Sequence, residues 1–116
     1  MTIAEIRDTL GAAVLSTNAD LSREVHAACG SDMMSDVLAY VKDQAVLVTG
    51  LNNPQVVRTA DMMDMVCIVF VRGKTPDAML LQLAEERGIA VLRCERTMFT
   101  ACGLLYEKGL RGGGKA

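Results

Sequence analysis

Three apolar runs of strand length, each followed by a stretch with helical spacing, constrain the fold of this chain more than any other feature. The runs cover residues 45–49, 65–71 and 89–92. Continuous apolar runs are typical of strands buried on both faces, which occur in parallel sheets with helical crossovers. We therefore expect an α/β fold: a three-layer sandwich with a mainly parallel sheet of about four to six strands, covered by helices on both faces.

Capping residues predict where the helices between these strands begin. Asn53 and Pro54 indicate a cap and first residue for a helix that ends near residue 64. Thr75 and Pro76 likewise indicate a cap and first residue for a helix that ends at Gly88. A last helix is expected from Thr97 to about Gly109.

The first third of the chain is less regular. Thr2 with Glu5 predicts a capping box for a helix that ends at Gly11, and a short helix is expected over residues 35–41. Residues 12–15 and 25–29 have the character of short strands, and two routes of the chain through this region remain open. We expect one domain over residues 1–110 and a flexible tail over residues 111–116.

Composition and charge exclude several classes of function. Aromatic residues make up only 3% of the chain and the net charge is -2, so we expect no nucleic-acid binding. The N-terminal segment carries acidic residues among its apolar ones and has no signal-peptide pattern, which predicts a cytoplasmic protein. The longest apolar run is far too short to cross a membrane.

The cysteines and the single histidine do not form a recognisable catalytic or metal-binding pattern. Cys29, Cys67, Cys94 and Cys102 have spacings that match neither a zinc ribbon nor a CxxC pair, so we expect reduced thiols, no metal and no cofactor. Cys67 belongs to the core. Cys94 is expected at a strand end near Arg residues and a helix start, which would lower its pKa. Two roles remain open for it, a reactive thiol and a half-buried small hydrophobic residue.

Other side chains that could carry chemistry have simpler interpretations. His26 has no nucleophile near it in the sequence, and Ser31, Asp32, Ser35 and Asp36 are expected to cap turns or helices. Residues 109–115 match the first seven positions of a P-loop, but Ala116 replaces the magnesium-binding Ser or Thr and no strand precedes them. We therefore expect no enzyme.

The carboxyl edge of the expected sheet is the candidate ligand site. In parallel sheets, ligands bind where strand ends lead into helix N-termini, which attract anions. The same residues also serve as ordinary turns and caps in α/β domains without a ligand. The candidate ligand-binding residues are Thr49, Gly50, Asn52, Asn53, Arg72, Gly73, Lys74, Thr75, Arg93, Arg96 and Thr97.

The order and spacing of several short motifs resemble those of the DRTGG domain. The motifs are Leu10-Gly11, the S-D-x-x-S-D-V segment at 31–37, the strand at 45–49, G-I-A-V-L at 88–92 and T-M-F-T at 97–100. The resemblance extends from Ile3 to about Leu110. The Asp-Arg-Thr-Gly-Gly string itself is missing, and residues 49–55 read T-G-L-N-N-P-Q where the related loop is expected.

The resemblance implies an accessory domain, similar to the N-terminal domain of HPr kinase and to the DRTGG domain beside the CBS modules of regulated pyrophosphatases. It implies a homodimer that senses a small anionic ligand, such as a nucleotide, and acts on an unidentified partner enzyme. The alternative is a pure interaction or assembly domain without a ligand, accessory to a redox enzyme. Met33, Met34 and residues 62–65 are candidate dimer contacts, with core packing as their other role.

Overall fold

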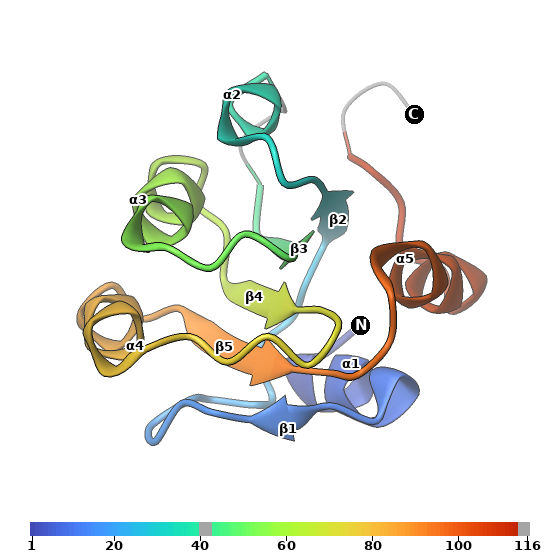
Figure 1. Ribbon diagram of the computed structural model, residues 1–116. Coiled ribbons are helices and arrows are strands. Elements are labelled where there is room, and N and C mark those ends of the chain that lie inside the picture. The colour runs from blue at the N-terminus through green and yellow to red at the C-terminus, as the bar shows by residue number, and fades with distance from the viewer. Residues whose placement is uncertain (40–42, 114–116) are drawn as a thin grey trace.

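Within residues 1–39 and 43–113, which the computed structural model describes, a five-stranded sheet forms the centre of the fold (Figure 1). The strands are β1 (Ala13–Val14), β2 (Ala27–Gly30), β3 (Ala45–Thr49), β4 (Cys67–Phe70) and β5 (Ala90–Arg93). The helices are α1 (Ile3–Leu10), α2 (Met34–Val37), α3 (Pro54–Met62), α4 (Ala78–Glu86) and α5 (Met98–Glu107).

The sheet has the order β1-β5-β4-β3-β2, and β2 to β5 are parallel. The edge strand β1 runs antiparallel to β5, with Ala13 opposite Arg93. The expected class, a mainly parallel sheet with helices on both faces, is confirmed. The route left open by the sequence is also settled, because residues 13–14 and 27–30 form the two opposite edges of the sheet.

Each central strand contributes side chains to two separate cores. Along β3, Val46 and Val48 pack into the core that includes residues of α1 and α5, whereas Leu47 packs into the core beneath α2, α3 and α4. Figure 1 shows α1 and α5 on one side of the sheet and the other three helices opposite. Full burial of each such side chain contributes about 1.5–3 kcal/mol before conformational entropy is counted. The helices on both faces are therefore needed.

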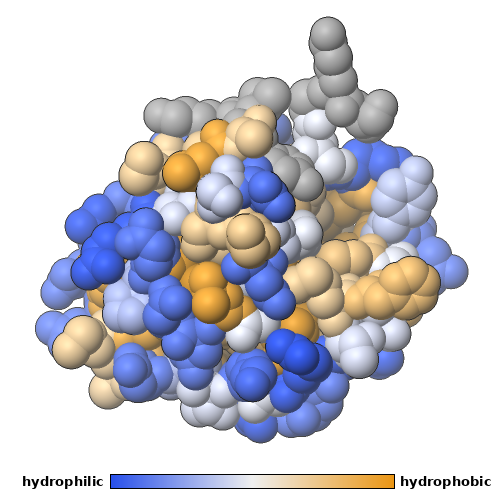
Figure 2. All heavy atoms as spheres, turned by 45° about the horizontal axis from the view of Figure 1, so that its top comes forward, coloured by the Kyte–Doolittle hydropathy of each residue, from blue (hydrophilic) through white to orange (hydrophobic). Residues whose placement is uncertain are grey.

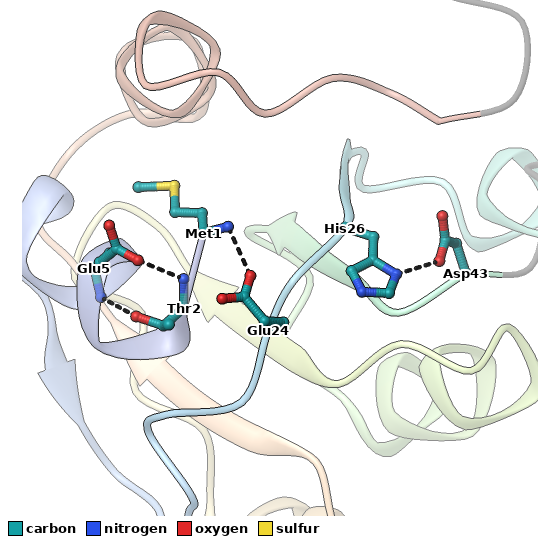
Figure 3. Close-up of polar contacts among 6 residues, drawn as sticks. All are labelled: Met1, Thr2, Glu5, Glu24, His26 and Asp43. Carbon is teal, nitrogen blue, oxygen red and sulfur yellow. Dashed lines mark hydrogen bonds and ion pairs between the residues drawn. The ribbon is translucent and has the colours of Figure 1, made fainter.

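Helix α1 has the predicted capping box (Figure 3). The backbone N–H of Glu5 donates to Thr2 Oγ1 at 3.1 Å, and the Thr2 N–H donates to the Glu5 carboxylate at 2.9 Å. The hydrogen bond from the Thr2 N–H lowers the pKa of the Glu5 carboxyl group. The N-terminal amine also pairs with Glu24 at 3.0 Å, which ties the start of α1 to the segment that leads into β2.

The other predicted helix starts are partly confirmed. Asn53 caps α3, with Pro54 as its first residue, and Thr97 caps α5. The prediction that Thr75 caps a helix starting at Pro76 is wrong, because Asp77 caps α4 by accepting a hydrogen bond from Leu80 N at 2.9 Å. The short helix expected over 35–41 is α2, which covers Met34–Val37, and residues 40–42 lie outside the described residues.

The methionines divide between the surface and the interior. Met33 and Met62 are 60% and 56% exposed. Met63 and Met65, in contrast, are buried in the core beneath α3 and α4. Their candidacy as dimer contacts is wrong, because they follow the last turn of α3 and pack inward.

The chain after α5 returns along the outer edge of β2. The N–H of Ala28 donates to the Arg111 carbonyl at 2.8 Å, and the Arg111 guanidinium lies 3.7 Å from the centre of the Tyr106 ring. A Cβ on Gly113 would lie 3.2 Å from the Ala27 side chain. The flexibility expected for residues 111–116 stays a prediction, and 114–116 lie outside the described residues.

We predict that Gly30→Ala destabilises the fold. A Cβ on Gly30, at the end of β2, would lie 2.6 Å from Cys102 Sγ on α5, so the Cys102 side chain or the helix would have to shift. Overpacking of this kind costs about 1–3 kcal/mol. Urea unfolding should show the loss, and the double variant Gly30→Ala with Cys102→Ala should recover most of it.

Gly103→Ala is the matched control for this substitution. Gly103 lies within α5 and no atom approaches its added Cβ within 4 Å. Alanine in a helix interior is favoured over glycine by about 0.5–1 kcal/mol, so this variant should be more stable than the parent protein. Equal effects of the two glycine substitutions would contradict the close contact between β2 and α5.

Candidate functional site

Hydrogen bonds between loops gather the predicted site residues at the carboxyl edge of the sheet. The N–H groups of Arg72 and Gly73, after β4, donate to the carbonyls of Arg96 and Cys94, after β5, both at 2.8 Å. Asn52 Nδ2, after β3, donates to the Thr75 carbonyl at 2.9 Å. The three loops expected to form one site therefore lie side by side.

The loop after β3 binds an internal anion, the carboxylate of Asp32, which follows β2 and is not among the predicted site residues. Asp32 Oδ1 accepts hydrogen bonds from the Gly50 N–H at 2.7 Å and from Thr49 Oγ1 at 3.1 Å. The Thr49 hydroxyl, which is buried, accepts in turn from Leu51 N at 3.1 Å. Asp32 was expected to cap a local turn, and it instead binds the next loop of the sheet, because β2 and β3 end together at this edge.

Arg72 is the basic residue best placed to contact a ligand. A Cβ on Gly50 would lie 2.7 Å from Arg72 Nη2, so the guanidinium rests against the Thr49–Gly50 turn. Neither Arg72 nor Lys74 forms an ion pair with any of the described residues, and both are exposed. Arg72 has a φ of 56°, a left-handed conformation that costs a non-glycine residue about 1–2 kcal/mol. Such strain is concentrated at functional sites.

The other two arginines of the predicted site are held by the protein itself. Arg93 Nε donates to the Gly73 carbonyl at 3.1 Å, and its Nη2 pairs with Glu95 at 3.0 Å. Arg96 Nε donates to the Leu10 carbonyl at 3.0 Å, at the end of α1. Two of the four basic residues predicted at this edge therefore hold loops and a helix end, whereas Arg72 and Lys74 form no ion pair with the described residues.

The three helix starts at this edge are not equivalent. Asn53 accepts from Gln55 N at 2.9 Å and Thr97 accepts from Thr100 N at 3.4 Å, so α3 and α5 begin with neutral caps. The cap of α4 is the carboxylate of Asp77, which already occupies the positive end of that helix. An anion is favoured near α3 and α5 and disfavoured near α4.

Cys94 does not have the environment expected for a reactive thiol. Its side chain is 2% exposed, and burial raises its pKa despite the neighbouring Arg96. The sequence pattern placed the residue correctly at the strand end but could not show that its side chain points into the core of α1 and α5. Cys67 is buried in the same core, as predicted, and its pKa is raised to about 12.

A second hollow lies at the opposite edge of the sheet. It has a volume of about 440 Å³ and an apolar floor that includes Ile3, Val66 and Ile89. Its rim carries one arginine and three acidic residues, namely Arg23, Asp20, Glu85 and Glu86. The excess of carboxylates makes this hollow less suited to an anion than the carboxyl edge.

His26 lies near this second edge, far from the candidate site, and is paired with an acidic residue. Its Nδ1 lies 3.1 Å from Asp43 Oδ1 on the exposed surface (Figure 3). Within residues 1–39 and 43–113, no group of three or more His, Cys, Asp or Glu side chains is arranged to hold a metal ion. No helix in that part of the chain is long and apolar enough to cross a membrane.

Comparison with known proteins identifies the family and one similar structure. The family model of the DRTGG domain matches residues 5–107. The crystal structure of the CBS and DRTGG domains of the regulatory region of Clostridium perfringens pyrophosphatase, complexed with its activator diadenosine tetraphosphate, superposes with a TM-score of 0.75 at 19% sequence identity. The similarity covers 90% of this chain and 45% of that one. The search of curated proteins finds no match.

We predict that Cys94 reacts slowly with iodoacetamide in the folded protein. A raised pKa leaves less thiolate at neutral pH, and burial limits access of the reagent. The labelling rate at Cys94, followed by peptide mass spectrometry at pH 7.5, should be well below that of a free cysteine and should rise after unfolding in urea. Labelling in the folded state as fast as that of a free cysteine would restore the reactive-thiol hypothesis.

Proposed function

The chain belongs to the DRTGG domain family, and on this premise we propose that it is a non-catalytic, ligand-sensing domain. It binds a small anionic ligand, such as a nucleotide, at the carboxyl edge of the sheet and acts on a partner enzyme. The observation that carries the proposal is the Arg72 guanidinium, which rests against the Thr49–Gly50 turn and has no ion-pair partner among the described residues. A planar cation with five donors suits phosphate groups.

The similar structure supports this function by analogy. The regulatory region of the clostridial pyrophosphatase, which contains a DRTGG domain, binds a nucleotide activator. At 19% identity the shared property is the fold, and this chain spans less than half the length of that one. The nucleotide and the regulated enzyme are therefore part of the proposal for this protein.

We assign two roles to the candidate residues in this proposal. Arg72, Lys74, Asn52, Thr49 and Gly50 contact the ligand. The remaining candidates hold the loops and helix starts in place, and they are Asn53, Gly73, Thr75, Arg93, Arg96 and Thr97. A few exposed charge-assisted contacts give about 4–6 kcal/mol, which corresponds to a dissociation constant of about 1 mM to 50 μM.

Exposed apolar side chains favour a second function, in which the domain only assembles with other proteins. Phe99 at the start of α5 is 89% exposed, besides Met33 and Met62. Figure 2 shows apolar side chains gathered on the right of the view, the side on which α5 lies in Figure 1. Surfaces of this kind mark protein interaction sites. In both functions we propose a homodimer.

We predict that pyrophosphate, ATP or diadenosine tetraphosphate raises the melting temperature of the protein. Arg72→Ala should weaken binding at least tenfold, because a charge-assisted hydrogen bond contributes about 1.5–3 kcal/mol, or about 10- to 150-fold in the dissociation constant. Alanine, like arginine, is a non-glycine residue strained at φ 56°, so the backbone strain is the same in the variant and in the parent protein. Calorimetry in low salt provides the dissociation constants, which should increase with ionic strength.

Lys108→Ala is the matched control, since it removes one exposed positive charge at the C-terminal end of α5. It should bind as the parent protein does. Arg96 is not used in this test, because its loss would also break the hydrogen bond to Leu10. Equal affinities of the parent protein and the Arg72 variant would place the ligand elsewhere, and absence of binding would favour the assembly function.

We predict a dimer of about twice the 12.5 kDa mass of the chain at tens of micromolar. Light scattering coupled to size exclusion measures this directly. If the exposed methionines form the interface, Met62→Glu should produce monomers whereas Phe99→Glu should not. The reverse result would place the interface on α5, and a monomeric parent protein would contradict the dimer.

A further inference from the structure

We propose that Asp32 is an internal competitor of the ligand and sets the affinity of the carboxyl edge for anions. The inference rests on the proposed function, since it concerns the same site. Asp32 follows β2, and its carboxylate occupies donors of the turn after β3. It is the group that a phosphate oxygen would have to replace there.

The donors at this turn serve one acceptor at a time. The Gly50 N–H and the Thr49 O–H each carry a single hydrogen, and both are directed at the same Asp32 oxygen. The next amide along the turn, that of Leu51, is satisfied by Thr49 Oγ1. A phosphate oxygen that binds the Gly50 amide must therefore displace Asp32.

Two side chains of opposite charge, the Arg72 guanidinium and the Asp32 carboxylate, lie at the turn and have opposite effects on an incoming anion. The Arg72 guanidinium and the Asp32 carboxylate both rest against Gly50, where an added Cβ would lie 2.7 Å from Arg72 Nη2 and 3.5 Å from Asp32 Oδ1. The arginine attracts an incoming anion and the carboxylate repels it. Because Asp32 is exposed, it is free to rotate into solvent when a stronger anion arrives.

This arrangement selects among anions. An anion with a single phosphate group gains little by replacing a carboxylate that is already bound. A ligand with several phosphates compensates for the loss of the Asp32 hydrogen bonds by contacting Arg72 and Lys74 as well. Asp32 thus favours polyphosphates over inorganic phosphate at this site.

Asp32→Asn tests the inference. The asparagine carbonyl retains both hydrogen bonds, which keeps the turn in place, but it removes the charge and is the weaker acceptor. We expect pyrophosphate to bind this variant about five- to tenfold more tightly than the parent protein, as measured by calorimetry. Asp32→Ala, which leaves the two donors open, should bind at least as tightly if its melting temperature without ligand shows that it is folded.

Asp64→Asn is the control for net charge. Asp64 is exposed between α3 and β4, at the opposite edge of the sheet, and its left-handed φ of 56° is one that asparagine also adopts. This variant should bind pyrophosphate as the parent protein does. A gain of the same size in both variants would mean that overall charge, and not competition at the turn, changed the affinity, and would overturn the inference.

The Gly50 amide signal in a ¹H–¹⁵N spectrum provides a second measurement. In the parent protein it should shift when pyrophosphate is added, and in the Asp32→Asn variant the shift should saturate at a lower concentration. If pyrophosphate binds the parent protein and the Asp32 variants equally well, the inference is wrong and the proposed function stands. If no variant binds pyrophosphate or a nucleotide, both are wrong.

Discussion

Two-sided burial of the central strands is the constraint on which the rest of the structure depends. Val46, Leu47 and Val48 of β3 enter two different cores, and the same alternation holds along β4 and β5. A strand of this kind needs a helix layer on each face, and the connections between parallel strands provide the helices. The connections also bring every strand end and helix start to one edge, so the candidate site follows from the packing.

The edge is held together by groups that would otherwise be available to a ligand. Arg93 and Arg96 are bound to loop and helix carbonyls, and Asp32 satisfies the turn after β3. Arg72 differs because its guanidinium forms no hydrogen bond or ion pair with the described residues, while its backbone has a left-handed φ. An edge that is held together without a ligand, with Arg72 and Lys74 forming no ion pair among the described residues, is compatible with the proposed sensing function.

The parts of the structure that depend on local pattern were predictable from the sequence. The strands at residues 45–49, 67–70 and 90–93 lie within or beside the expected apolar runs, and Asn53 and Thr97 cap the expected helices. The start of α4 was not predictable in this way, because Thr75-Pro76 and Asp77 both fit a helix start. In the structure Asp77 caps the helix and Pro76 lies buried before it.

The candidate site was predictable only in its location, since it depends on contacts between segments far apart in the sequence. Nothing local indicates that Asp32 bonds to Gly50 or that Arg96 reaches Leu10, and a count of basic residues could not distinguish free from engaged side chains. The antiparallel pairing of β1 with β5 is non-local in the same way.

The segment after α5, which lies along the edge strand β2, affects how readily that edge can pair with a strand of another molecule. An open edge strand offers unpaired N–H and C=O groups to any other extended chain, and such edges seed aggregation. Here the Arg111 carbonyl takes the Ala28 N–H, and the neighbouring Gly113 backbone lies against Ala27. The short segment after α5 thereby covers part of the β2 edge and leaves fewer backbone groups there for a strand of a second molecule to pair with.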